Sequence, residues 1–303
     1  MLSRVAESLY WIGRYLERAE HSARVLQAMR DLKLDLFEVD REESEEQWRS
    51  ALRTLLLPDL AVERLILDPG EPASLLCCVS RARENARQVR EVISPEMWEK
   101  LNQSYWSLRD AVGVGMNEGT VSGALTGIVS SSFLWDGVAD ASMIRGEGWL
   151  FLKLGKFAER LDGLPRLIVA RMESKERPST GHSGENVKWL TLLKTLDALD
   201  AYRKAQPKRV DRRAVLQFVM FEEDFPRALR YSTNMAADLA RRLLRLHPES
   251  GRRVQRAFGR IAARVEYADL ESIEAQGEAA FLRGVAEDVI EASNVLQKTF
   301  FLC

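Results

Sequence analysis

One polar pattern, which occurs twice in helix-like surroundings, limits the fold of this sequence more than any other feature. Residues 13–24 read GRYLERAEHSAR, and residues 155–166 read GKFAERLDGLPR. Both copies have the form Gly-x-x-x-Glu-Arg-x-acid-x-x-x-Arg. The glycine, the two acids and the last arginine therefore follow at intervals of four, three and four residues, which places all of them on one ridge of an α-helix. The pattern predicts two long helices with equivalent polar ridges.

Apolar residues recur every three or four positions along most of the chain, and almost no segment alternates with a period of two. In the first segment this apolar face comprises Leu2, Val5, Leu9, Ile12, Leu16, Ala19, Ala23 and Leu26. Helical patterns also cover 146–172, 187–204, 211–223, 225–246, 249–266 and 272–302. Ser94 and Pro95 have the residue types of a helix N-cap and first turn. The fold class predicted from these patterns is all-α.

A second pair of similar segments supports an internal duplication. Residues 67–87 read LDPGEPASLLCCVSRARENAR and align with residues 221–241, which read FEEDFPRALRYSTNMAADLAR. This alignment places Pro72 on Pro226, Glu84 on Asp238 and Arg87 on Arg241. Because both pairs of segments occur in the same order, we expect an internally duplicated helical bundle with two pseudo-symmetric halves.

The predicted organisation is a single domain, 1–303, with internal halves 1–112 and 143–266. The Gly/Ser-rich residues 113–142 are interpreted as a connector that includes a small-residue helix, and 272–302 as a C-terminal helix. Residues 31–46 are charged and aperiodic, which indicates another connector. Residues 174–186 have the composition of a loop and account for most of the extra length of the second half.

The polar ridges predict burial. A glycine inside a helix lowers stability by about 0.5–1 kcal/mol relative to alanine, so its presence in both copies indicates close approach of another backbone. A carboxylate beside such a contact needs a cationic partner. The candidates are Arg18 and Arg24 within the motif, and Arg87 and Arg241 in the second pair of segments.

Two interpretations of these residues stay open. Glu17–Arg24 and Glu84–Arg87 are either structural ion pairs that lock helix to helix, or parts of two functional polar clefts. The candidate residues under both interpretations are Glu17, Arg18, Glu20, Arg24, Glu84, Arg87, Glu159, Arg160, Asp162, Arg166, Asp238 and Arg241.

Composition excludes several classes of function. The formal net charge of −1 gives no sign of the basic surface that nucleic-acid binding requires, so no nucleic acid is expected as a partner. No stretch approaches 18 uncharged apolar residues, so no membrane span is expected. The three cysteines, Cys77, Cys78 and Cys303, do not form a disulfide framework. The odd number favours a reducing compartment, and the predicted location is the cytoplasm.

No familiar catalytic or cofactor motif is present. The three histidines are His21, His182 and His247, and none belongs to a metal-binding pattern, so we expect an exposed or capping role rather than a metal. The glycine-rich stretch 113–127 lacks the lysine of a phosphate-binding loop. The basic stretch 204–213 is interpreted as a solvated loop. The sequence therefore predicts neither a bound cofactor nor a metal, and catalytic residues are unknown.

Several longer motifs carry a family resemblance. The segments LSRVAESLYWIGRYLERAEHSARVL, RARENARQVREVISPEMWEKLN, GVADASMIRGEGWLFLKLGKFAERLD and FVMFEEDFPRALRY resemble the bacterial α-E domain family, named for its all-α character and its Glu-Arg signature. The stretch 113–135 has no match, and the C-terminal helix matches weakly. By this resemblance, Glu17-Arg18 and Glu159-Arg160 are the signature positions.

The resemblance also implies partners. Members of the family are associated with circularly permuted ATP-grasp proteins and transglutaminase-like peptidases, in systems proposed to form and cleave amide or peptide bonds. We therefore expect a non-catalytic helical accessory protein. The sequence does not indicate its oligomeric state. The alternative is an enzyme component whose Glu/Arg cleft acts on carboxylate or amine substrates.

Overall fold

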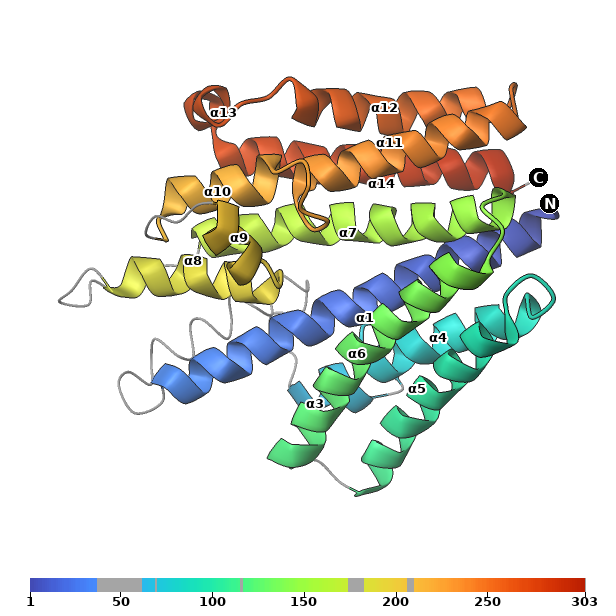
Figure 1. The fold of residues 1–303 in the computed structure, drawn as a ribbon, viewed down its shortest axis with the longest axis horizontal. Helices are drawn as coiled ribbons and strands as arrows, with labels where there is room; N and C mark the ends of the chain where they lie inside the picture. Colours follow the sequence, from blue (N-terminus) through green and yellow to red (C-terminus); the bar gives the residue numbers. More distant parts are fainter. Residues whose placement is uncertain (37–61, 69, 115–116, 174–182, 206–209, 303) are drawn as a thin grey trace.

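The described part of the chain is built from helices around a contact between two long ones (Figure 1). The computed structural model describes residues 1–36, 62–68, 70–114, 117–173, 183–205 and 210–302. Within these ranges the secondary structure is α-helical with connecting turns and contains no strand, so the predicted all-α class is confirmed.

Four helices of the first part of the chain pack in a ring. Helix α1 (Ser3–Leu36) contacts α4 (Leu75–Gln88), α4 contacts α5 (Pro95–Val114), and α5 contacts α6 (Glu118–Ser142), which returns to α1. The short helix α3 (Val62–Leu67) lies against α4. This arrangement buries or partly buries the apolar face predicted from its spacing, except Leu2, which precedes α1 and is exposed.

Local side-chain caps determine where these helices begin. The Ser74 hydroxyl accepts a hydrogen bond from the backbone N–H of Cys77 at the start of α4. Ser94 accepts one from Met97 at the start of α5, as the sequence predicts. Asn117 and Thr120 form a reciprocal capping box at the start of α6.

Four helices of the later part form a second ring. Helix α7 (Glu147–Glu173) contacts α11 (Leu229–Leu246), α11 contacts α12 (Gly251–Glu266), and α12 contacts α14 (Glu278–Phe300), which returns to α7. Figure 1 shows α1 and α7 lying between the two groups of helices. The two rings therefore meet mainly at the pair of helices α1 and α7.

Three shorter helices connect α7 to α11. These are α8 (Ser183–Thr195), α9 (Leu199–Ala205) and α10 (Arg212–Phe221). The single helix expected over 187–204 is wrong, because the chain turns between α8 and α9 through Asp197, whose φ is 53°.

The C-terminal region also contains a break that the pattern does not show. A single helix was expected over 272–302, whereas the structure has α13 (Leu270–Gln276) followed by α14. Gly277 separates them with a φ of 96°, a left-handed conformation that glycine adopts without steric strain.

Parts of the predicted connectors are helical. Residues 118–142 of the Gly/Ser-rich stretch 113–142 form α6, the small-residue helix expected there. Because α6 is one of the four helices of the first ring, this stretch is part of the packed fold as well as a connector. Helix α1 continues to Leu36, into the expected connector 31–46. Most of the expected loop 174–186 lies outside the described residues, and α8 begins at Ser183.

Candidate functional site

The two motif glycines lie where α1 and α7 cross. A Cβ atom built on Gly13 would overlap the carbonyl oxygen of Leu152 and stand 2.8 Å from the backbone nitrogen of Lys156. A Cβ on Gly155 would overlap the carbonyl oxygen of Tyr10. The close backbone approach expected from the repeated glycine is therefore present, and each glycine faces the backbone of the other motif's helix.

The Glu-Arg pair of each motif binds the Glu-Arg pair of the other. Arg160 on α7 donates to both carboxylate oxygens of Glu17 on α1, with nitrogen–oxygen distances of 2.6 and 2.8 Å. In return, Arg18 on α1 donates to both oxygens of Glu159 at 2.5 and 3.0 Å. Two bidentate ion pairs therefore cross the α1–α7 contact in opposite directions, which gives the strong geometry of a planar guanidinium on a carboxylate.

The ion pairs are shielded from water. Glu17 is 4% exposed and Glu159 is 7% exposed, so the expected burial of both carboxylates is confirmed. Arg14 adds a third cation, with its Nε 2.6 Å from Glu159. Because isolated buried charges are strongly disfavoured, each carboxylate depends on its arginine partner.

The charges keep both acids ionised despite burial. Burial alone raises the pKa of the Glu17 carboxyl, but Arg160 outweighs it and holds that pKa at about 2. Burial opposes ionisation of Glu159 in the same way, and Arg14 and Arg18 hold its pKa below the ordinary value. The seam between α1 and α7 is therefore a set of fixed charges.

The second acid of each motif extends this seam. Glu20 accepts from Arg24 at 2.9 Å on its own helix and also pairs with Arg227, which precedes α11. Asp162 pairs with Arg166 one turn later on α7. None of the partners expected for Glu17 is correct: Arg24 binds Glu20, Arg18 binds Glu159, and the cation on Glu17 is Arg160 of the other motif.

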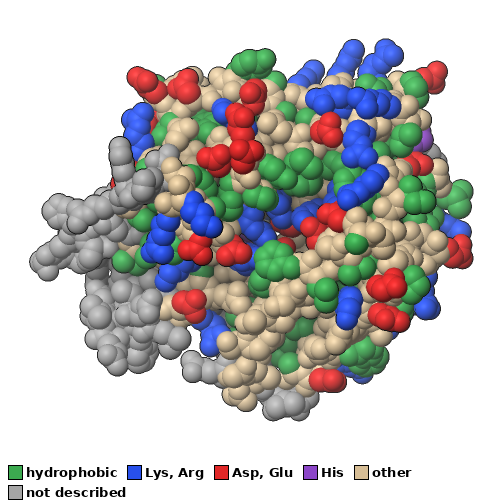
Figure 2. Space-filling view, viewed as in Figure 1, with side chains coloured by type: hydrophobic (Ala, Val, Ile, Leu, Met, Phe, Trp, Pro, Cys, Tyr) green, Lys and Arg blue, Asp and Glu red, His purple; other side chains and the backbone are tan. Residues whose placement is uncertain are grey.

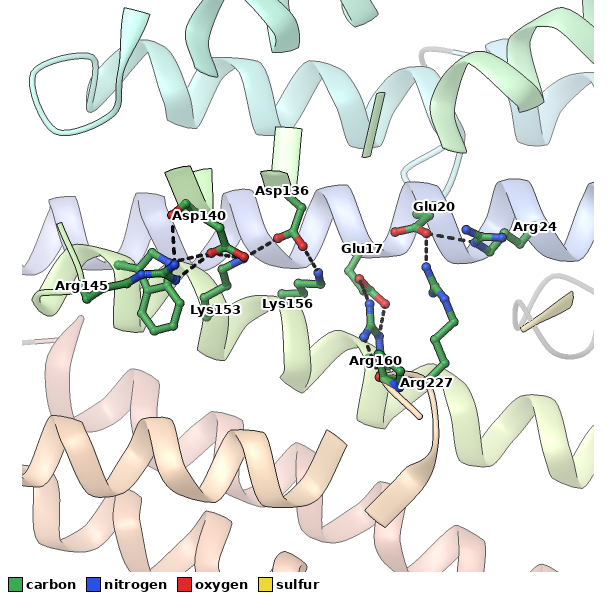
Figure 3. Close-up of polar contacts among 12 residues, drawn as sticks. Glu17, Glu20, Arg24, Asp136, Asp140, Arg145, Lys153, Lys156, Arg160 and Arg227 are labelled. Atoms are coloured by element: carbon green, nitrogen blue, oxygen red, sulfur yellow. Dashed lines mark hydrogen bonds and ion pairs between the residues drawn. The ribbon is translucent and has the colours of Figure 1, made fainter. Parts of the chain in front are cut away.

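A further group of charges, which the sequence analysis did not single out, continues the seam along α6. Lys153 and Lys156 of α7 donate to Asp136 at 2.5 and 2.6 Å, and Lys153 also lies 2.9 Å from Asp140. Figure 3 shows these side chains in line with Glu17 and Arg160. Burial raises the pKa of the Asp136 carboxyl, yet the two lysines hold it at about 2. In the sequence, the signal for this group of charges is that Asp136 is an isolated acid at the end of an almost uncharged stretch.

The acid–arginine pairs of the second pair of segments lie outside the seam. Glu84 and Arg87 pair at 3.0 Å on one face of α4, with side chains 47% and 62% exposed. Asp238 and Arg241 pair in the same way on α11, with 48% and 57% exposed. The interpretation that Glu84–Arg87 locks one helix to another is therefore wrong, because both residues belong to α4 and face solvent.

His21 packs against the position where the second motif has glycine. A Cβ on Gly163 would lie 3.2 Å from His21 Nε2. That nitrogen is buried and has no hydrogen-bond partner among the described residues. Burial lowers the pKa of His21 to about 4. The expectation of an exposed or capping His21 is wrong, whereas His247 does cap the end of α11 and contacts Glu147 at 2.8 Å.

The space beside the seam is small. A cavity of about 20 Å³ is lined by residues of α1, α6 and α7, among them Glu17, Asp136 and Lys156. This volume accommodates a single water molecule, since a buried water needs roughly 10–15 Å³ measured this way. The cavity beside Glu17 is consequently too small for an organic substrate.

A larger hollow lies on the other side of α7. It measures about 370 Å³, runs between α7 and α14, and has Val169, Leu282 and Ile290 among its apolar lining. Arg166 is the one motif residue at its edge, and Arg166 already pairs with Asp162. This hollow has the volume of a small-molecule site, but its lining is mainly apolar.

Metal-binding groups were also considered. No group of three or more His, Cys, Asp or Glu side chains with the spacing of a metal site occurs in the described ranges. Cys77 and Cys78 are free thiols on α4. His182 and Cys303 lie outside the described residues.

Residues 1–301 match a protein family described as a predicted alpha-helical domain with a conserved ER motif. The reciprocal contacts of Glu17-Arg18 with Glu159-Arg160 give that motif a structural meaning in this chain. The chain belongs to the Alpha-E family. The family resemblance found in the sequence is therefore confirmed over nearly the whole chain.

Curated relatives of this Alpha-E chain are longer proteins. Uncharacterized proteins of Mycobacterium bovis and of two strains of Mycobacterium tuberculosis are each 26% identical to it over 272 residues. The match covers 78% of this chain and 29% of each relative. The chain thus spans less than a third of the length of these relatives. No solved structure matches the chain.

Proposed function

We propose that this Alpha-E chain is a non-catalytic helical accessory protein that binds an ATP-grasp amide ligase and a transglutaminase-like peptidase. The observation that carries the proposal is the filled seam between α1 and α7. Its signature side chains neutralise one another in pairs, and the cavity beside them has room for about one water molecule. Residues engaged in this way stabilise a helix contact and leave no open position for a substrate.

The lengths of the relatives support a role beside another polypeptide. In each mycobacterial relative, the segment similar to this chain makes up less than a third of the protein. A domain found joined to other polypeptide in its relatives fits an accessory role. The identity of the partners, and peptide or amide modification as the reaction of the system, rest on the family resemblance.

We also propose that the fold arose by internal duplication. Helices α1, α4, α5 and α6 contact one another in the same cyclic order as α7, α11, α12 and α14. In this correspondence Glu17 matches Glu159, and α6 matches α14. The C-terminal helix would then belong to the second half, which differs from the division at residue 266 expected from the sequence.

We infer a cytoplasmic location from the thiols. Cys77 and Cys78 are free and adjacent on one helix, as expected in a reducing compartment. A further finding is that none of the described helices has both the length and the apolar character to span a bilayer.

An enzyme component is the alternative, and one observation favours it. Arg166 borders the hollow between α7 and α14, whose volume suits a small molecule. Replacing Arg166 by Ala would then abolish the reaction of the complex without changing its assembly. An accessory role predicts that the same replacement leaves the reaction unchanged once the complex has formed.

Calorimetry tests the proposal directly. The purified chain is titrated with Mg·ATP alone, and again after mixing with an ATP-grasp protein from the same organism. We expect no heat of binding from the chain alone, formation of a complex with the ATP-grasp protein, and nucleotide binding by that complex. Saturable micromolar binding of Mg·ATP by the chain alone, or failure to bind the ATP-grasp protein, would overturn the proposal.

A further inference from the structure

A strongly basic surface lies along α11 and α12, although the chain as a whole is nearly neutral. Residues 241–264 hold eight arginines and one glutamate, a formal charge of +7 in a chain whose total is −1. Figure 2 shows Lys and Arg side chains gathered over the part of the surface that α11 and α12 form. This local excess of positive charge is therefore not visible in the total charge of the chain, and the predictions from sequence missed it.

The arginines of α12 form a row that winds partly around the helix, since each step of four residues turns it by about 40°. Arg252, Arg256, Arg260 and Arg264 follow at intervals of four residues and are exposed; we call them the arginine row. Successive members rise about 6 Å along the helix, so the row is about 18 Å long. On the opposite face, Val254, Phe258, Ile261 and Val265 are buried, which fixes the orientation of the row toward solvent.

Most of these guanidinium groups are unpaired. Among the described residues, Arg241 pairs with Asp238 and Arg264 with Asp288. Exposed Arg245, Arg252, Arg253, Arg256 and Arg260 form no ion pair within the described part of the chain. This differs from the α1–α7 seam, where the acids of each motif are matched by arginines. Arg252, Arg256 and Arg260 of the row are therefore available to an external anion.

Acidic neighbours limit what can bind. Asp288 of α14 lies 3.1 Å from Arg264, and the charges of Glu287 and Glu291 act on the same carboxyl group. A duplex nucleic acid or a flat anionic membrane is larger than an 18 Å row, so it would meet these acids as well. A narrow anionic ligand avoids them when it lies on the first part of the row, since Arg256 and Arg252 precede Arg264 by about 12 and 18 Å along the helix.

We propose that the arginine row docks an acidic helix of a partner polypeptide. Acidic side chains at intervals of four residues on that helix repeat at about 6 Å, the same rise as the row, and a carboxylate matches a guanidinium in bidentate geometry. Tyr267, 88% exposed at the end of α12, and Leu246, 52% exposed before its start, supply apolar contacts at the two ends. This inference rests on the proposed accessory function for the existence of a protein partner.

The test uses the full chain and two probes, the ATP-grasp protein and a synthetic helical peptide with Glu at every fourth position. The variant replaces Arg252, Arg256 and Arg260 by Glu. The matched control replaces Arg4, Lys194 and Arg203 by Glu, since these cations are exposed on other helices and form no ion pair among the described residues. Circular dichroism establishes that both variants keep the melting temperature of the native chain.

We expect the row variant to bind both probes at least about tenfold more weakly than the native chain at low salt, with a shallower salt dependence. The affinity of the control variant should stay within about twofold of that of the native chain. Equal binding by the row variant and the native chain overturns the inference while leaving the accessory function intact. Binding of the peptide but not of the ATP-grasp protein by the native chain supports the row and rejects the accessory function. Tighter binding of duplex DNA or phosphatidylserine vesicles than of the peptide overturns the choice of partner.

Discussion

The glutamate of each Glu-Arg pair, Glu17 or Glu159, is neutralised by the arginine of the other pair, across a helix contact. Glu17 binds Arg160 and Glu159 binds Arg18, each through two hydrogen bonds. Adjacent residues on a helix point in different directions, so a Glu cannot reach the Arg beside it with this geometry. Each Glu-Arg pair in the sequence thus supplies one member of each of two ion pairs. The second Glu-Arg pair supplies the other two members.

Replacing Glu17 by Gln should destabilise the chain. The change leaves the buried guanidinium of Arg160 without a counter-charge, which lowers the free energy of unfolding by roughly 3–5 kcal/mol. Urea unfolding monitored by circular dichroism measures this. The control is Glu84→Gln, which breaks an exposed pair on α4 and should change stability by less than about 1 kcal/mol. Similar values for both variants would contradict the structural role of Glu17.

The pH dependence of stability should contain a contribution from His21. The pKa of His21 is lowered to about 4 in the folded chain from an ordinary value of 6.5, so the unfolded chain takes up a proton first as pH falls. The stabilisation is complete above pH 6.5 and is lost as pH falls toward about 4, at up to about 1.4 kcal/mol per pH unit.

His21→Gln removes this titration, so its free energy of unfolding should fall less steeply between pH 6.5 and 4 than that of the native chain. The acids of the seam act at lower pH. Glu17 and Asp136, with pKa values of about 2, lose their stabilisation as pH falls from their ordinary range toward 2. A His21→Gln variant with an unchanged slope above pH 4 would exclude the histidine as its source.

At the scale of helices, the glycine of each motif determines how closely α1 and α7 approach. Gly13 faces the backbone of α7 and Gly155 faces the backbone of α1, and this proximity lets short carboxylates reach across the contact. The sequence predicted the approach because a mid-helix glycine needs a packing reason. The helix breaks at Asp197 and Gly277 were not predicted, because the apolar periodicity continues through both.

Gly13→Ala and Gly155→Ala should each lower the melting temperature. A methyl group at either position overlaps a backbone carbonyl, so the helices must separate and the ion pairs lengthen, with an expected loss of about 1–3 kcal/mol. Gly127→Ala on α6 is the matched control, since its Cβ would meet no atom within 4 Å. Alanine favours a helix by about 0.5–1 kcal/mol over glycine, so this control should be neutral or stabilised. A tolerated alanine at Gly13 would contradict the close contact.

At the scale of the whole molecule, the pair of helices α1 and α7 forms most of the contact between two rings of helices. The all-α class and the burial of Glu17 and Glu159 followed from periodicity and spacing. The partner of each acid did not, because Arg160 and Arg18 are distant in sequence and several arginines were equally available. The lysines on Asp136 and the arginine row of α12 were missed for another reason, namely that a total charge of −1 averages separate clusters of opposite sign.

The two rings should unfold together. The α1–α7 contact contains buried charges that neither ring can neutralise alone, so separating the rings exposes unpaired groups in both. Differential scanning calorimetry of the native chain should give one transition whose calorimetric and van't Hoff enthalpies agree. Two resolved transitions would show that the rings are independent and that the seam contributes little.

The most direct test of the central claim is the coupling energy between Glu17 and Arg160, measured by a double-mutant cycle on the free energy of unfolding. The cycle comprises the native chain, Glu17→Gln, Arg160→Gln and the double variant, with Glu84→Gln and Arg87→Gln as the exposed comparison. Residues in contact couple by about 0.5–3 kcal/mol. We predict about 2 kcal/mol or more for Glu17–Arg160 and less than about 0.5 kcal/mol for Glu84–Arg87. Additive effects of Glu17→Gln and Arg160→Gln would contradict the account, because the two motifs would then not hold α1 and α7 together.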